Sequence, residues 1–152
     1  MKTTLLLPKY FKTIGYILFV LFLVLVLFVP DSLLSDMKTF AIFSQEWDDL
    51  KFFQIIKDDM YEEICASFLI VSLIFIAFSK EEHEDEYINS IRLNTLLLST
   101  YIGYGFTLFT ILFVYGFVAV SFIFFSLFAI LVTFIIVFNI RLCRLKYSKN
   151  EK

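Results

Sequence analysis

The stretch LNTLLLSTYIGYGFTLFTILFVYGFVAVSFIFFSLFAILVTFIIVFNI, residues Leu93–Ile140, contains no charged side chain. Its one interruption is the pair Tyr115-Gly116, which divides it into halves of similar length. About 20 apolar residues, at a rise of about 1.5 Å each, cross the roughly 30 Å hydrocarbon core of a bilayer. Each half is therefore long enough to cross a membrane, and the stretch predicts a transmembrane helical hairpin.

The composition of the whole chain also indicates an integral membrane protein. Hydrophobic residues make up 60% of the 152 residues, whereas soluble domains contain about half. The mean hydropathy is +0.85. With two prolines and four glycines there is no flexible linker, and we find no internal repeat. The sequence predicts an all-α integral membrane protein with one membrane domain, residues 1–152, and no separate soluble domain.

Two further apolar segments precede this hairpin. The first follows three lysines, and no small-x-small cleavage site precedes Asp31, so we interpret it as a retained signal-anchor and not a cleaved signal peptide. The second has only 16 uncharged residues between Glu63 and Lys80, about 24 Å of helix, which is short for a bilayer. Backbone groups in hydrocarbon must be satisfied within the segment, so all the spans should be helices. The four expected transmembrane helices are residues 13–29, 64–78, 95–114 and 117–140.

Lysine and arginine near the ends of the spans predict the orientation, because they collect on the cytoplasmic side. Ten of the 13 lie on one side of the expected bilayer, and three lie in the loop between the first two spans. This asymmetry places both termini in the cytoplasm and residues 30–63 outside. Cys65 and Cys143 then lie near opposite faces of the membrane, too far apart for a disulfide.

The expected outer loop contains a helical pattern of apolar residues. Ser44 is a suitable N-cap for a helix that starts at Gln45, although Phe52 and Ile55 break the pattern that follows. We expect an amphipathic helix on the outer bilayer face or against the bundle, with a docking surface for an external partner as the alternative. The expected apolar stripe consists of Trp47, Leu50, Phe53, Ile56, Met60 and Ile64.

The loop between the second and third spans carries a dense acidic block. Ser79 and Glu82 have the spacing of a capping box, so we expect a helix to begin here and to run into the third span as a cytoplasmic extension. The helix dipole favours acidic residues in such first turns. We interpret the block as a candidate cytoplasmic interaction surface, which comprises Glu81, Glu82, Glu84, Asp85, Glu86 and Arg92.

The segments FSKE at 78–81, EDEYI at 84–88 and IRL at 91–93 carry a family resemblance. They are similar to a block in small, uncharacterised, four-span proteins of the bacterial inner membrane, and the likeness extends to the hydropathy layout of roughly the whole chain. The resemblance implies four spans, a location in the bacterial inner (cytoplasmic) membrane and a genetic link to small helix-turn-helix regulators. It implies no activity, substrate or catalytic residue.

The acidic block also raises the question of a metal site, because Glu82, His83 and Glu86 lie within about one helical turn. Carboxylate-rich metal bundles take their ligands from several facing helices, whereas this chain has a single histidine on a single expected helix. A Ca²⁺ loop would need a glycine-containing twelve-residue pattern, which the block lacks. We therefore expect a solvated acidic helix end, with no metal and no cofactor.

The C-terminal tail is basic and lies on the same expected side as the acidic block. Ion pairs between them would hold the third and fourth helices in register, but exposed pairs contribute only about 0–1 kcal/mol each. Anionic lipid is the alternative partner, at about 1 kcal/mol for each Lys or Arg near the surface, and is the one we favour. The candidate lipid-binding residues are Arg141, Arg144, Lys146 and Lys149.

No ionisable side chain lies inside any expected span. Ion-coupled transporters, proton relays and voltage sensors use such residues, so these classes are disfavoured. Small and hydroxyl residues gather along the third and fourth spans, which is typical of close helix packing, while Leu98, Ile102, Phe109 and Leu112 should face away. The expected helix-packing face comprises Ser99, Gly103, Thr107, Thr110, Ala119, Ser126 and Thr133.

These features favour a non-enzymatic interaction or regulatory protein that contacts a protein partner or lipid. A homo-oligomeric pore is the alternative, since hydroxyls and carbonyls can line a channel without charged residues. An enzyme has almost no support, because the spans hold neither a nucleophile with its base nor paired carboxylates. We expect no nucleic-acid partner.

Overall fold

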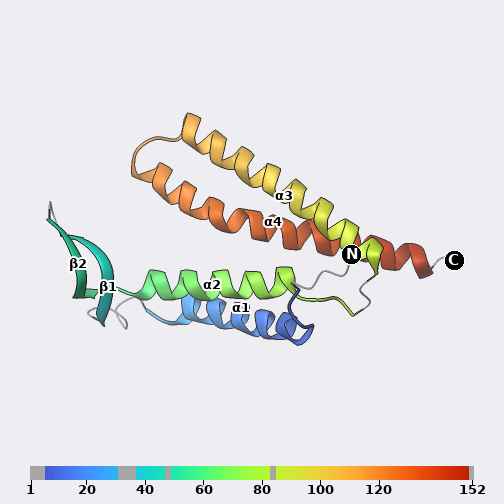
Figure 1. The fold of residues 1–152 in the computed structure, drawn as a ribbon, viewed down its shortest axis with the longest axis horizontal. Helices are drawn as coiled ribbons and strands as arrows, with labels where there is room; N and C mark the ends of the chain where they lie inside the picture. The colour runs from blue at the N-terminus through green and yellow to red at the C-terminus, as the bar shows by residue number, and fades with distance from the viewer. Residues whose placement is uncertain (1–5, 31–36, 47–48, 83–84, 151–152) are drawn as a thin grey trace. The chain divides into compact units, whose positions relative to one another are not determined.

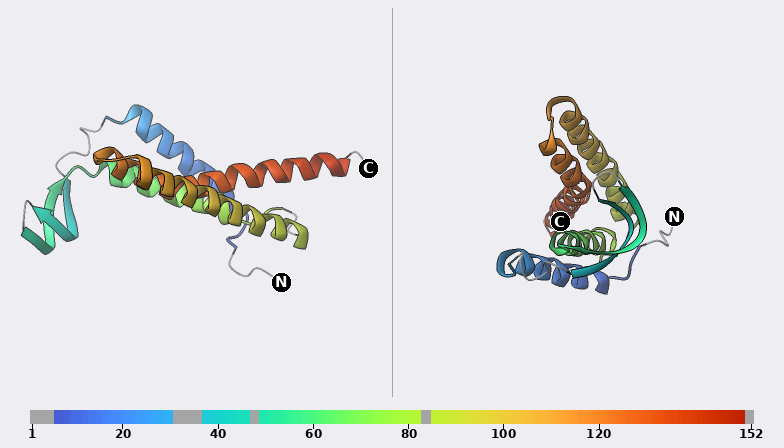
Figure 2. Two further views of the ribbon diagram at one scale, coloured as in Figure 1. Left: turned by 90° about the horizontal axis from the view of Figure 1, so that it is seen from above. Right: turned by 90° about the vertical axis from the view of Figure 1, so that its left-hand side faces the viewer.

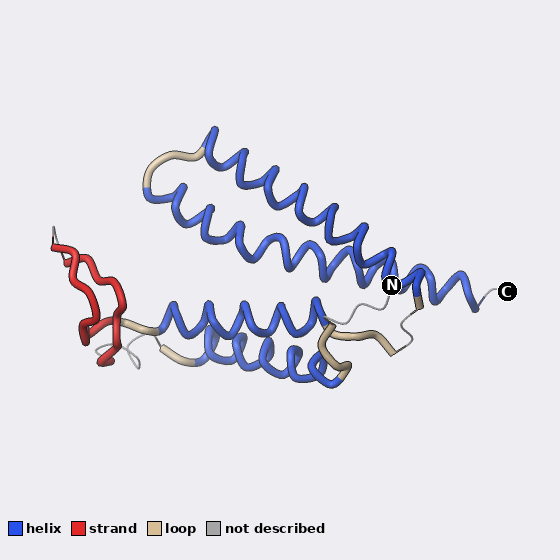
Figure 3. The backbone as a smooth tube through the Cα atoms, viewed as in Figure 1, coloured by secondary structure: helices blue, strands red, loops and turns tan. Residues whose placement is uncertain are grey.

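The computed structural model of the chain describes residues 6–30, 37–46, 49–82 and 85–150. Four long helices and one β-hairpin follow one another along the chain (Figures 1 and 3). The chain divides into two compact units, Met1–Ile17 with Ile70–Lys152, and Leu18–Leu69. In chain order the elements are α1 (Tyr10–Phe28), β1 (Met37–Glu46), β2 (Asp49–Asp58), α2 (Tyr61–Phe78), α3 (Glu86–Phe113) and α4 (Phe117–Asn150).

All four helices are long and apolar enough to cross a membrane, as the sequence predicts. Large apolar side chains are exposed on every one of them, which suits helices that are surrounded by lipid. The short second span gains one turn, because α2 already begins at Tyr61. Its 18 residues give about 27 Å of helix, close to the thickness of the hydrocarbon core.

The helices α3 and α4 lie side by side and are joined by a short turn (Figure 1). The turn falls at the predicted break. The Val114 N–H donates to the Thr110 carbonyl at 2.9 Å, and Gly116 has a φ of 77°. A positive φ is readily adopted by glycine and disfavoured for other residues, so Gly116 allows the chain to reverse here.

The core of the first unit lies where the end of α2 meets α4. Phe134 is fully buried there, and the ring of Phe78 stacks on it at 5.9 Å between centroids. The ring of Phe138, one turn further along α4, also stacks on Phe134, at 5.5 Å between centroids. Ala77 and Leu142 complete the buried cluster. Residues four apart share one face of a helix, so this cluster follows a single stripe of α4.

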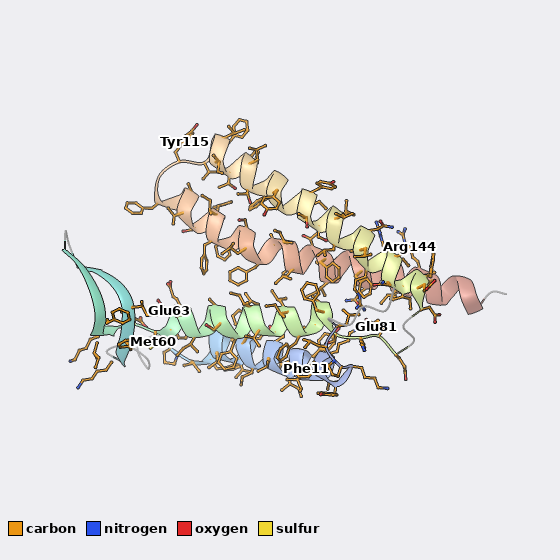
Figure 4. All side chains as sticks on the ribbon, in the orientation of Figure 1. Phe11, Met60, Glu63, Glu81, Tyr115 and Arg144 are labelled. Atoms are coloured by element: carbon orange, nitrogen blue, oxygen red, sulfur yellow. The ribbon has the colours of Figure 1, made fainter. Side chains whose placement is uncertain are left out.

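The helices α1 and α2 approach closely at Gly15. A Cβ built at this position would lie 2.9 Å from Cγ1 of Ile76 and 3.0 Å from the Ile76 backbone nitrogen. Glycine is therefore the residue that permits this contact. One turn away, the rings of Phe11 and Phe75 meet edge to face at 5.0 Å (Figure 4 labels Phe11). In the second unit, the Tyr61 hydroxyl donates to the Leu25 carbonyl at 3.2 Å.

The segment between α1 and α2 is an antiparallel β-hairpin, so the prediction of an amphipathic helix from Gln45 to Ile64 is wrong. The two views in Figure 2 show the pair of twisted strands. Phe52 and Ile55, which break the helical pattern, are residues of strand β2. Aromatic and β-branched residues are enriched in strands, and pairing with β1 satisfies the backbone groups that a helix would have bonded internally. The expected stripe residue Trp47 lies outside the described residues.

The start of α3 also differs from the prediction. The expected capping box at Ser79 does not form, and α3 begins at Glu86 with Asp85 as its N-cap residue. The Ser79 hydroxyl instead donates to the Phe75 carbonyl. The backbone around Ser79 forms a parallel bridge to Leu7, with Leu7 N–H to Phe78 carbonyl at 3.0 Å and Lys80 N–H to Leu7 carbonyl at 2.9 Å. Extended backbone at this bridge is incompatible with the first turn of a helix.

Candidate functional site

An open groove lies between the first turns of α3 and the distal part of α4. It has a volume of about 330 Å³. Tyr87 and Ile91 are four residues apart on α3, and Arg141, Arg144 and Leu145 lie within about one turn of α4, so each helix presents one face to the groove. Figure 4 shows Arg144 where α4 passes the start of α3. The lining residues are Tyr87, Ile91, Arg141, Arg144 and Leu145.

Two of the five lining residues are arginines, so the groove is cationic. Arg144 is exposed and Arg141 half-buried. Among the residues that the structure describes, neither guanidinium has a hydrogen-bond or ion-pair partner. The hydroxyl-bearing Tyr87 is 62% exposed, and its ring and the side chains of Ile91 and Leu145 supply an apolar wall. The arrangement can therefore hold a molecule with an anionic group at one end and hydrocarbon at the other.

The position of the groove along the helices matches the boundary of the apolar stretch. The charge-free run ends at Ile140, and Arg141 is the next residue of α4. On α3 the same run starts at Leu93, and Ile91 and Tyr87 come before it. If the helices cross a bilayer, the groove lies at the depth of the lipid headgroups, where arginine and tyrosine are the expected anchors.

Arg92 has a different role from the surface position that the sequence suggests. It is only 5% exposed, so its assignment to an interaction surface is wrong. Its Nη2 donates to the Ser79 carbonyl at 3.4 Å, and its guanidinium carbon lies 5.1 Å from the centre of the Phe138 ring. Arg92 thus connects the end of α2 to α3 and α4, and a cation over an aromatic face is a favourable contact.

The other described acidic residues of the block lie in the loop before α3 and at its first residue. Glu81, in the loop between α2 and α3 (Figure 4), forms an ion pair with Lys12, with 2.5 Å between Oε1 and Nζ. Glu82, Asp85 and Glu86 are exposed. Glu84 and His83 lie outside the described residues, as do the side chains of Lys146 and Lys149.

All residues of the expected helix-packing face are buried or half-buried in the structure. Ser99, Gly103, Thr110 and Ser126 are buried, and Thr107, Ala119 and Thr133 are half-buried. The closest approach is at Gly103, where a built Cβ would overlap Cγ1 of Ile130 and lie 3.1 Å from its Cδ1. Ile102, the next residue on α3, is 47% exposed.

The hydroxyl groups along this face bond to their own helices. The Ser99 Oγ donates to the Thr95 carbonyl at 2.8 Å, and the Thr110 Oγ1 donates to the Phe106 carbonyl at 3.0 Å. On α4, the Ser126 Oγ donates to the Ile123 carbonyl at 2.6 Å. Such bonds satisfy a buried hydroxyl without a second helix, so this face is held by close packing and not by bonds across it.

A second hollow differs from the groove in size and charge. A smaller hollow of about 190 Å³ lies beside the first turns of α2 and has Met60 and Glu63 in its wall (both labelled in Figure 4). It contains no cation, and its Ser67 hydroxyl already donates to the Glu63 carbonyl at 2.7 Å. Over the described residues, no three Cys, His, Asp or Glu side chains gather as metal ligands.

Comparison of the chain with family models, with curated proteins and with solved structures found no match. The assignment of a function therefore depends on the groove itself. Sequence reasoning identifies the two arginines of the groove but not the residues that complete it. Tyr87 and Ile91 are four residues apart, just before the third span. This helical spacing is the signal that could have placed them on one face of a helix, opposite Arg141 and Leu145.

Proposed function

We propose that this chain is a non-enzymatic multi-pass membrane protein that acts by binding, and that the groove between α3 and α4 takes the phosphate of an anionic lipid. The observation that carries the proposal is the pair of unpaired arginines, Arg141 and Arg144, on the wall of a groove that also has apolar residues. Planar guanidinium groups bind phosphate in a bidentate manner, and two of them one turn apart suit a single headgroup.

Several features support lipid over the other partners considered. Within the acidic block, Glu81 forms its ion pair with Lys12 and not with an arginine of the groove. A soluble phosphate compound would gain little from the Ile91 and Leu145 side chains, whereas the upper part of a lipid chain would bury against them. A protein partner that contacts this end of the molecule is the alternative to lipid.

A homo-oligomeric pore receives less support. A pore would need hydroxyls or carbonyls directed into a channel. Ser99 and Thr110 of α3 and Ser126 of α4 are buried within the chain and bonded to their own helices. These three hydroxyls are thus already used in packing within the chain.

The lipid proposal predicts that removing the two arginines weakens binding of anionic lipid. Each Lys or Arg near a membrane surface contributes about 1 kcal/mol, so the variant Arg141→Gln/Arg144→Gln should bind phosphatidylglycerol about 30-fold more weakly. Native mass spectrometry of the protein from mixed phosphatidylcholine–phosphatidylglycerol nanodiscs would count the lipids retained per chain. The matched control is Lys9→Gln/Lys80→Gln, which removes the same charge from exposed positions outside the groove.

The two variants separate a site from general attraction. Equal losses in both would mean that net charge and not the groove attracts the lipid. Unchanged binding in both would contradict the lipid proposal and favour the protein partner, which affinity purification from membranes would then seek.

We place the protein in the bacterial inner membrane with both termini in the cytoplasm, on the basis of the lysine and arginine asymmetry and the likeness of the acidic block. Cys143 is exposed and Cys65 is buried, and both are free thiols. A maleimide that cannot cross membranes should therefore miss Cys143 in sealed cells and label it after permeabilisation. The variant Cys143→Ala should abolish this signal, and labelling of Cys143 in intact cells would contradict the orientation.

A further inference from the structure

The β-hairpin exposes an apolar surface that neither the groove nor the helix packing explains. Phe40 is 61% and Ile42 52% exposed on β1, and Phe53 is 69% and Ile55 70% exposed on β2. Contiguous exposed apolar patches on a protein mark a surface that is covered by something else. We call these four residues the hairpin face.

The register of the strands places the hairpin face on one side of the sheet. Phe40 is the direct partner of Ile55, and the Phe40 and Phe53 rings lie 6.2 Å apart. Alternate residues of a strand point to opposite sides. Thr39 and Ala41, which alternate with Phe40 and Ile42, are half-buried. The hairpin thus exposes four large apolar side chains on one side, where a sheet in water would carry polar residues.

A two-stranded hairpin is at best marginally stable in water, so the hairpin face needs a cover. The short connection to α2 indicates what could cover the hairpin face. Only Asp59 and Met60 separate the end of β2 from Tyr61, the first residue of a helix that is long and apolar enough to cross a membrane. Three residue steps reach at most about 10 Å. The base of the hairpin is therefore held close to the place where α2 would enter the bilayer.

The charges at the base of the hairpin face fit a lipid surface. Lys38 and Lys57 are exposed direct partners in the register and share the side of Phe40 and Ile55. Like charges directly opposite each other destabilise a strand pair in water. Lipid phosphates would relieve this repulsion, and lysine stems reach the headgroup level while apolar neighbours sit deeper. A second copy of the chain would bring two further lysines to the same place and increase the repulsion.

We propose that the hairpin face lies in the surface of the bilayer that α1 and α2 enter, with its aromatic and isoleucine side chains among the headgroups and upper lipid chains. The hairpin is then an interfacial anchor. Aromatic residues are enriched at this depth, and amphipathic elements bind there through their apolar side. The inference rests on membrane crossing by the helices, which is part of the proposed function, and is independent of lipid binding in the groove.

The test uses tryptophan fluorescence in the full-length protein, reconstituted in phosphatidylcholine vesicles. Trp47 is the only tryptophan, so Trp47→Phe gives a background for single probes. Phe40→Trp and Phe53→Trp place a probe on the hairpin face. Tyr104→Trp places the matched aromatic probe near the middle of the charge-free part of α3, at a residue that is 66% exposed. Brominated phosphatidylcholines that carry bromine near the headgroup or deep in the chains then quench each probe according to its depth.

We expect both hairpin probes to emit at blue-shifted wavelengths and to lose more fluorescence to shallow bromine than to deep bromine. Tyr104→Trp should show the opposite order. Quenched Tyr104→Trp with unquenched, water-like emission from both hairpin probes would overturn the inference and leave the membrane assignment intact. Hairpin probes whose emission shifts with dilution of the protein in lipid would also overturn it, in favour of a second copy. Absence of quenching at all three positions would contradict membrane crossing itself, and with it both proposals.

Discussion

Replacing Gly103 by leucine is expected to destabilise the α3–α4 pair by about 1–3 kcal/mol, the usual cost of overpacking a close contact. The physical reason is the position of Ile130, whose Cγ1 already occupies the space that a Cβ would take. Either the two helices move apart or Ile130 leaves its preferred rotamer, and both lose packing that lipid does not replace. The measurement is thermal aggregation of the purified protein in detergent, with the parent in parallel.

A neighbouring glycine provides the control. Gly105 is also on α3, and a Cβ built there meets nothing within 4 Å. Gly105→Leu should therefore leave the aggregation temperature unchanged or raise it, because glycine weakens a helix relative to other residues. Ile102→Leu, at an exposed position next to Gly103, should be nearly silent. If Gly103→Leu behaves like these two variants, then α3 and α4 are not in contact at Gly103.

Replacing Arg92 by alanine is expected to lower stability by about 2 kcal/mol. The change removes the donor to the Ser79 carbonyl, and a buried group left without its partner costs about 1–3 kcal/mol. It also removes the cation from the Phe138 ring, a contact that contributes about 0.5–2 kcal/mol. The readout is the same aggregation assay in detergent.

The controls for Arg92 separate a buried role from a simple loss of charge. Arg144→Ala removes the same charge from an exposed position and should change stability by less than about 0.5 kcal/mol. Arg92→Lys should be intermediate, because an ammonium keeps the charge and loses the planar guanidinium that lies on the ring. Equal stability of Arg92→Ala and Arg144→Ala would show that Arg92 does not connect the helices as described.

The helices are the part of the fold that the sequence predicts well. Four apolar segments of sufficient length are a local property, since a chain in hydrocarbon must bond its own backbone within the segment. The turn at Tyr115-Gly116 is also local, because glycine adopts the positive φ required there. The spacing of Ser99, Gly103 and Thr110 on α3 likewise picks out residues that the structure buries.

The candidate site is predicted only in part. Arg141 and Arg144 follow directly from the change of composition after Ile140. The groove itself needs Tyr87 and Ile91 of α3, which lie at least 50 residues earlier in the chain. Their contribution depends on how far α3 extends past its charge-free run and on which of its faces meets α4. Neither quantity is a property of a single segment.

The sequence by itself determined the four apolar helices and the small residues that let α3 and α4 approach, because these depend on local composition and on the length needed to cross hydrocarbon. The tertiary structure decided the rest. The pairing of β1 with β2 overrode a helical pattern, the bridge from Leu7 to Ser79 displaced the start of α3, and the Phe138 ring and Ser79 carbonyl made a buried place for Arg92. Each of these contacts joins two different segments of the chain, so its energy does not appear in the pattern of either segment alone.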